Sequence, residues 1–95
     1  MSDLISAAIN TLNAKLGGDF DGSAKFVIPE EGTIMLDAAG ARAGDDDADV
    51  TMTADADTFR DIIEGELNPT TAFMSGRLTI DGDMGTAMKL ASALA

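Results

Sequence analysis

Four short segments alternate between apolar and polar residues, which is the pattern of a strand with one buried face. They are Ala24–Ile28, Thr33–Asp37, Val50–Ala54 and Arg77–Asp81. Residues 29–32 read as a tight turn, because proline presets the backbone of the first corner, and the first two strands therefore form a hairpin. Gly40 predicts a further turn with a weaker strand beyond it.

Apolar residues at helical spacing predict two amphipathic helices in the first two thirds of the chain. One is capped by Ser2 or Asp3 and stopped by Gly17-Gly18. Its apolar stripe is Leu4, Ile5, Ala8, Ile9, Leu12 and Leu16. The other is capped by Asp55 or Asp57 and runs to Asn68-Pro69. Its apolar residues are Phe59, Ile62, Ile63 and Leu67.

The segment from Asn68 to the C-terminus predicts two more helices around the last strand. The residue before a proline avoids the helical region, whereas proline suits a first helical turn, so a short helix starts at Asn68-Pro69. Gly76 ends this helix. After the strand, Asp83 is a suitable N-cap for a final helix.

This order of elements predicts an α+β fold with helices over a mostly antiparallel sheet of five strands. Ninety-five residues fit one domain, 1–95, and no repeat or linker interrupts the chain.

The predicted final helix has an inward face of mostly small or flexible side chains. The residues at helical spacing are Met84, Ala87, Met88, Ala91, Leu94 and Ala95. One interpretation is the wall of an apolar cavity, because small residues leave space and methionine adapts to irregular volumes. The other is an ordinary alanine-rich helix packed close to the sheet, since alanine is the best helix former.

Composition removes several kinds of chemistry. The chain contains no cysteine and no histidine, so disulfides, thiol nucleophiles, zinc fingers and imidazole catalysis are excluded. The net charge of −11 argues against nucleic acid as a partner and against strong binding to anionic membranes. No basic leader or long apolar run is present, so we expect a cytoplasmic protein.

The acidic residues offer little sign of a metal site or a catalytic centre. Asp45, Asp47 and Asp49 imitate the start of a calcium loop, but Val50 stands where that loop needs glycine and Ala56 where it needs glutamate. A solvated loop without a metal is the prediction.

A lone carboxylate in an apolar pocket can act as an acid or base, and Glu64, Glu66 and Asp81 are the candidates. Nothing in the sequence distinguishes one of them, so we expect a protein that is not an enzyme and needs no cofactor.

The C-terminal pattern NPxxAFxxGxLxIxGDMGxAMKL, from Asn68 to Leu90, resembles the signature of the sterol carrier protein 2 family. The order of the preceding elements is also similar, so the resemblance covers nearly the whole chain. It implies a small α/β domain whose sheet and helices enclose a tunnel for lipids. By this resemblance the last helix and the short helix after Asn68 border the ligand.

The sequence therefore predicts a carrier for an apolar ligand such as a fatty acid, an acyl-CoA, an isoprenoid or a sterol-like molecule. The predicted ligand-binding residues are Phe59, Ile62, Ile63, Leu67, Phe73, Met74, Met84, Ala87, Met88, Ala91 and Leu94. The alternative is an accessory domain that presents a lipophilic substrate, for example a quinone precursor, to a partner enzyme. Because the chain stops close to its last helix, we also expect that one cavity end is open or covered by a second subunit.

Overall fold

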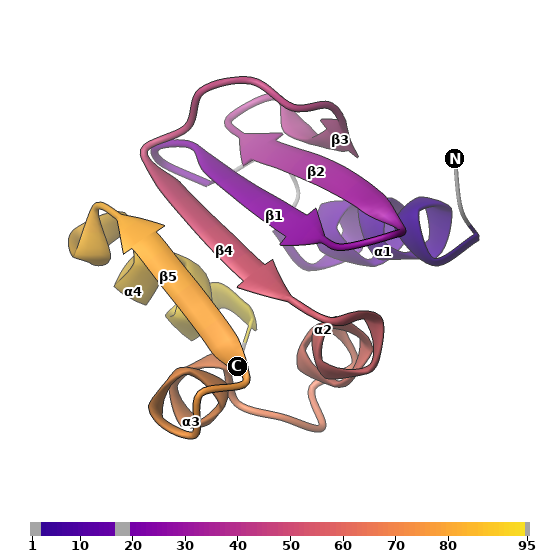
Figure 1. The fold of residues 1–95 in the computed structure, drawn as a ribbon. Coiled ribbons are helices and arrows are strands. Elements are labelled where there is room, and N and C mark those ends of the chain that lie inside the picture. The colour runs from indigo at the N-terminus through magenta and orange to yellow at the C-terminus, as the bar shows by residue number, and fades with distance from the viewer. Residues whose placement is uncertain (1–2, 17–19, 95) are drawn as a thin grey trace.

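The computed structural model describes residues 3–16 and 20–94, which form four helices and five strands (Figure 1). In chain order they are α1 (Asp3–Leu16), β1 (Ala24–Ile28), β2 (Gly32–Asp37), β3 (Gly40–Ala43), β4 (Val50–Ala54), α2 (Ala56–Ile63), α3 (Pro69–Met74), β5 (Leu78–Gly82) and α4 (Met84–Leu94). No helix in the described ranges is long and apolar enough to cross a membrane.

The five strands form one mixed sheet in the order β3-β2-β1-β4-β5. The pairs β1–β2, β2–β3 and β4–β5 are antiparallel, and the central pair β1–β4 is parallel. The predicted α+β class and mostly antiparallel sheet are confirmed. A parallel pair needs a connection that returns to the same end of the sheet, and here β2, β3 and the acidic segment 44–49 provide it.

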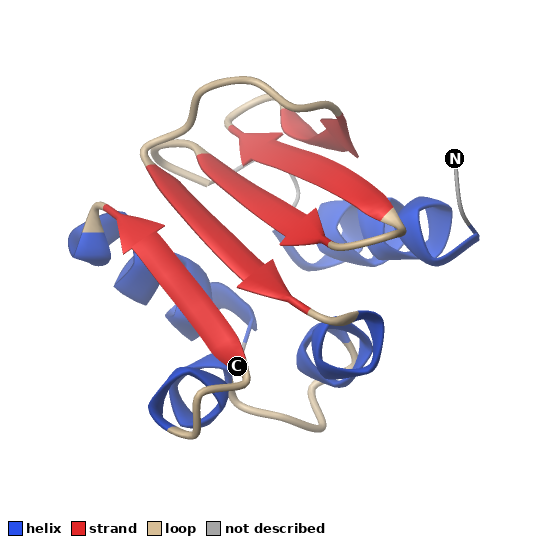
Figure 2. Ribbon diagram, in the orientation of Figure 1, coloured by secondary structure: helices blue, strands red, loops and turns tan. Residues whose placement is uncertain are grey.

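The helices leave one broad face of the sheet uncovered (Figure 2). Helices α1 and α4 lie behind the other face, and α2 and α3 lie near the end of the sheet where β4 ends and β5 begins (Figure 1). Strand β1 contributes three buried side chains to the hydrophobic core: Ala24, Phe26 and Ile28. Helices α1 and α2 contribute residues to the same core cluster. The Phe59 ring of α2 packs on the Phe26 ring with 5.3 Å between their centroids.

The predicted end of the second amphipathic helix is wrong. Helix α2 ends at Ile63, with Glu64 as its C-cap, and does not continue to Asn68-Pro69. Gly65 has a φ of +79°, a left-handed conformation that ends a helix readily. Leu67 therefore lies in the turn between α2 and α3, where it is half-buried against the core.

The uncovered sheet face also carries one large buried side chain. Met35 of β2 is buried although it points away from Ile34 and Leu36. The start of the acidic segment contacts this face: Lys25 Nζ lies 3.0 Å from Asp45 Oδ1, and Gly44 lies against the Met35 side chain. The residue just before the segment that resembled a calcium loop thus packs on an apolar side chain.

Candidate functional site

A pocket of about 240 Å³ opens between α3, α4 and the β4–β5 end of the sheet. Its exposed surface is made by apolar atoms alone, and none of its lining residues is ionisable. The lining residues are Met52, Pro69, Thr70, Phe73, Met74, Ile80, Met84, Ala87, Met88 and Ala91. Such a concave, apolar volume is typical of a site for a small hydrophobic ligand.

The sheet forms the floor of this pocket through one cross-strand pair. Met52 of β4 lies opposite Ile80 of β5 in the antiparallel register. Both belong to the helix-facing set of alternating residues, because side chains two positions apart share one face of a strand. The Met52 side chain is buried, and Ile80 is half-buried.

Helix α3 is placed by its N-cap, Asn68, and its first residue, Pro69. The Asn68 side chain caps it by accepting hydrogen bonds from the backbone N–H of Thr70, at 2.8 Å, and of Thr71, at 3.4 Å. Pro69 occupies the first turn, where its missing N–H costs nothing, and is itself buried. This short helix brings Phe73 and Met74 to the pocket.

Helix α4 is fixed by the predicted cap. Asp83 accepts hydrogen bonds from Gly85 N, at 3.1 Å, and from the Thr86 hydroxyl, at 2.7 Å. These bonds hold the pKa of the Asp83 carboxyl below its usual value, and the nearby Lys89 acts in the same direction.

The predicted inward face of α4 is wrong in its rotation. The residues that α4 buries are Thr86, Ala87, Leu90 and Leu94, so Leu90 belongs to the core and had no place in the predicted face. Met84 and Met88 are exposed, and Ala91 is half-buried. Helix α4 thus has two apolar sides, one in the core and one along the pocket, and Ala87 lies where they meet. Ala95 lies outside the described residues.

The structure brings six of the eleven predicted ligand-binding residues together. Those that line the pocket are Phe73, Met74, Met84, Ala87, Met88 and Ala91. The other five belong to or pack against the core cluster and do not line the pocket: Phe59, Ile62, Ile63, Leu67 and Leu94. Whether any of the eleven binds a ligand stays a prediction.

Four lining residues lie outside the predicted set: Met52, Pro69, Thr70 and Ile80. For Met52 and Ile80 the strand alternation was a usable signal, since it places both side chains on the face of the sheet that the helices cover. We expected residues on that face to belong to the core, because the sequence does not show which part of the face the helices leave open. Pro69 and Thr70 read only as helix-start residues.

The mouth of the pocket is an exposed apolar surface. Among the described residues, the large hydrophobic side chains with substantial exposure are Phe73 at 40%, Met74 at 81%, Met84 at 45% and Met88 at 51%. All four line this one pocket. Apolar side chains that gather on a surface mark an interaction site more often than scattered ones do.

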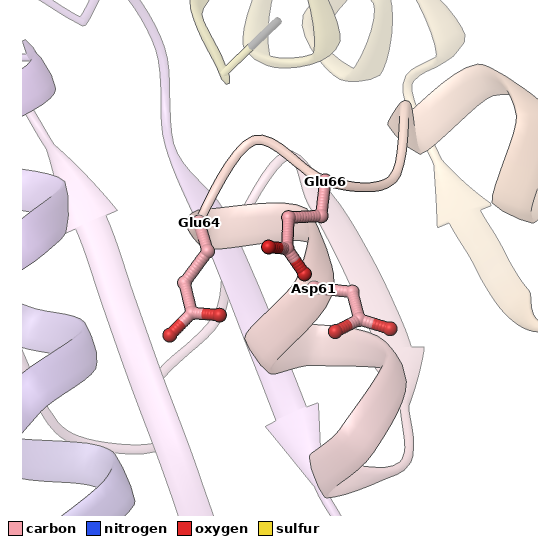
Figure 3. Close-up of side chains that lie close together, drawn as sticks. All are labelled: Asp61, Glu64 and Glu66. Carbon is pink, nitrogen blue, oxygen red and sulfur yellow. The ribbon is translucent and has the colours of Figure 1, made fainter.

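The candidate catalytic carboxylates, Glu64, Glu66 and Asp81, do not line the pocket. Glu64 and Glu66 gather with Asp61 at the end of α2, and their carboxylate oxygens lie within 4.8 Å of one another (Figure 3). Asp61 is 3.9 Å from the Arg77 guanidinium. Asp81 is exposed on the sheet face opposite Ile80. None of these carboxylates lines the pocket, and the described residues that line it are all uncharged.

A second hollow of about 380 Å³ lies on another side of α4. It is wide and partly polar, and it is lined by Lys15, Leu16, Phe20, Asp21, Lys89 and Ala93. Lys89 Nζ lies 3.4 Å from Asp21 Oδ2 there. The charges of this hollow face water and each other, which suits a solvated surface.

Comparisons with known proteins converge on one family. A model of the SCP-2 sterol transfer family matches residues 6–95. The hydroxysteroid dehydrogenase-like protein 2 of Xenopus tropicalis is 33% identical over 102 residues, which cover 99% of this chain and 24% of that protein. Sterol carrier protein 2 of Bos taurus is 40% identical over 67 residues, which cover 64% of this chain and 12% of that protein. The chain thus spans a quarter or less of the length of these curated relatives.

Among solved structures, sterol carrier protein 2 of Aedes aegypti in complex with palmitate superposes with a TM-score of 0.81. The match covers 100% of this chain and 97% of that one, at 20% sequence identity. At this identity, the likeness shows the fold.

Proposed function

The chain belongs to the SCP-2 sterol transfer family, and on this premise we propose that it binds a single-chain lipid by its hydrocarbon tail. The observation that carries the proposal is the pocket between α3, α4 and the sheet, which is apolar throughout and open to solvent. The palmitate complex of the mosquito protein supports a fatty-acyl tail as the first ligand to test.

We further propose how such a ligand lies. Because no lining side chain is charged, a carboxylate or other headgroup gains nothing inside and stays in water at the mouth. The tail enters first and contacts Met52 and Ile80 at the floor. The methionines of α4 adjust to tails of different shape, because their side chains are unbranched and flexible.

Affinity in this arrangement comes from burial of methylenes. Each contributes about 0.8 kcal/mol, so a tail that buries about fourteen gains about 11 kcal/mol. Loss of ligand freedom takes back about 4 kcal/mol or more, which leaves a dissociation constant of the order of 10 µM. A ligand held at this strength is also released, as carriage between two places requires.

Native mass spectrometry of gently purified protein tests the proposal. We expect a co-purifying lipid, or uptake of an added fatty acid at a ratio of one to one. A fluorescent fatty-acid titration should then give a micromolar constant. Failure to bind fatty acids, acyl-CoAs, isoprenoids and sterols alike would overturn the proposal.

A second candidate is that the domain presents a lipophilic substrate to a partner enzyme. It is favoured by the relatives in which the matching segment is a quarter or less of a longer protein named as dehydrogenase-like. In that case the exposed apolar mouth faces the partner while the ligand passes. The test is a pull-down with the unaltered protein as bait, compared with a pull-down with the Met74→Asp variant, which places a charge at the mouth of the pocket. Recovery of an enzyme by the unaltered protein and not by the variant supports this candidate.

A further inference from the structure

The methionine side chains of the described residues are either almost fully buried or substantially exposed. The chain has six methionines and no cysteine, so methionine is the only amino acid that can undergo oxidation at sulfur. Five of the six lie within the described ranges. Met35 and Met52 are each 2% exposed, whereas Met74, Met84 and Met88 are between 45% and 81% exposed.

The three exposed methionines of the described ranges all line this apolar pocket. Met74 comes from α3, and Met84 and Met88 come from α4, one helical turn apart. A surface shaped only for solubility or for general contact has no reason to gather the exposed thioethers of the described residues at one opening. The mouth of the candidate lipid site is therefore also a place where an oxidant in water meets sulfur.

We propose that this mouth is a methionine-oxidation site, and that a peroxide-type oxidant switches off lipid binding there without unfolding the protein. The inference rests on the proposed function for its effect on binding. In the reaction a sulfur lone pair attacks one peroxide oxygen, an S–O bond forms and the O–O bond breaks. The sulfur loses two electrons to hydrogen peroxide, the transferred oxygen releases its proton, and the leaving oxygen takes up that proton and departs as water.

The sulfoxide acts on binding because the pocket has no polar surface of its own. Oxidation places a strongly polar oxygen on a side chain that a lipid tail has to cover. Covering it without a hydrogen-bond partner weakens binding by about tenfold for each buried sulfoxide. Met84 and Met88 carry this effect, because they flank Ala87 and Ala91 on the pocket side of α4.

Met74 provides an internal comparison. It is 81% exposed, so its sulfoxide keeps most of its contact with water whether or not a ligand is bound. Oxidation of Met74 should change binding by less than about threefold. The fold should tolerate all three sulfoxides, because none of these side chains belongs to the core cluster.

The test treats the intact protein with increasing hydrogen peroxide and maps sulfoxides by peptide mass spectrometry. We expect Met74, Met84 and Met88 to be oxidised while Met35 and Met52 are protected. Fatty-acid affinity should fall at least tenfold with an unchanged far-UV spectrum and should return after treatment with methionine sulfoxide reductases. Equal oxidation of Met52 and Met84 would overturn the inference.

Leucine variants test whether oxidation of Met84 and Met88 causes the loss of lipid binding. Leucine cannot be oxidised at sulfur and replaces methionine with little change in volume. The affinity of the Met84→Leu/Met88→Leu protein for the fatty-acid probe is measured before and after peroxide, and peroxide should change it by less than about threefold, whatever its value before treatment. Met74→Leu should lose binding after peroxide as the unaltered protein does. Loss of binding in the double variant on peroxide treatment would overturn the inference, as would normal binding by the oxidised unaltered protein. If the unaltered protein does not bind the fatty-acid probe before peroxide, the proposed function is overturned. The proposed effect of oxidation on lipid binding is then overturned as well.

Discussion

Met88 and Leu90 stand two residues apart on α4 and face opposite environments: Leu90 is fully buried in the core, whereas Met88 is 51% exposed at the mouth of the pocket. The same helix therefore holds the fold together on one side and forms the candidate site on the other.

This division predicts that substitutions of the two residues have separable effects. Leu90→Ala should lower the free energy of unfolding by about 2–5 kcal/mol, because it leaves a cavity in the core. Met88→Ala should lower it by about 1 kcal/mol or less and weaken fatty-acid binding instead. Urea denaturation and a fluorescent fatty-acid titration measure the two quantities. Equal destabilisation by both changes would contradict the assignment of the two sides.

The substitution Ala91→Leu tests whether the Ala91 side chain borders open volume. This alanine is half-buried and lines the pocket, so Ala91→Leu should extend into open volume and stabilise the ligand-free protein by about 1–2 kcal/mol. The added side chain should also weaken lipid binding, because it fills volume that a tail needs. Denaturant unfolding of delipidated protein measures the first effect and titration the second.

The matched control for Ala91→Leu is Ala7→Leu, at an exposed position of α1. It should leave both stability and binding nearly unchanged. If Ala91→Leu is destabilised by about 1–3 kcal/mol yet binds normally, the residue is close-packed and the ligand lies elsewhere.

Gly82 at the end of β5 should tolerate no side chain. Its φ is +118°, and an added Cβ would lie 2.5 Å from Asp49 O and 3.0 Å from Val50 Cα, both backbone atoms of the neighbouring segment. Gly82→Ala should therefore lower the free energy of unfolding by about 3 kcal/mol or more. Gly76→Ala is the control, since its φ is +81° but nothing lies within 4 Å of the added Cβ. Strain alone should make that change cost about 1 kcal/mol.

The N-cap aspartates predict how stability depends on pH. Asp55 has a lowered pKa because the backbone N–H and the hydroxyl of Thr58 both interact with its carboxylate, and hydrogen bonds from Thr86 and Gly85 lower that of Asp83. A pKa lowered in the folded state gives stability that is present above the ordinary value of 3.8 and is lost as the pH falls through the lowered value.

Thermal melts between neutral pH and pH 2 measure this loss. Asp55→Asn/Asp83→Asn should keep the caps, because asparagine also accepts hydrogen bonds at an N-cap, but should remove the titrating groups. Its melting temperature should fall less steeply below pH 4 than that of the unaltered protein. Parallel curves would show that other carboxylates govern acid unfolding.

Calcium should have no specific effect on stability. Within the acidic segment, Asp45 pairs with Lys25, and the Asp49 side chain accepts a hydrogen bond of 3.2 Å from Ser23 N. Millimolar calcium should therefore move the melting temperature no more than sodium of equal ionic strength. Specific binding would add about 2.7 kcal/mol at a hundredfold excess over the dissociation constant, which a melt detects readily.

The local pattern of the sequence determined the elements. Strands β1 and β4 span the predicted residues, Asp55 (one of two candidates) and Asp83 cap their helices as expected, and the short helix starts at Asn68-Pro69 as predicted. These features depend on neighbours within a few positions, where alternation, proline and short polar side chains act directly on the backbone.

The turn at residues 29–32 predicted the β1–β2 hairpin, but the tertiary structure alone decided the other strand neighbours and the rotation of α4. Alternation assigns a side chain to a face of a strand but says nothing about the partner, so the parallel β1–β4 pair had no signal in the sequence. Helix α4 is apolar around most of its circumference, so its sequence cannot choose between burying Met88 and burying Leu90. Packing makes that choice, because the core accepts Leu90 and Leu94 beside α1 and leaves the methionines at the pocket.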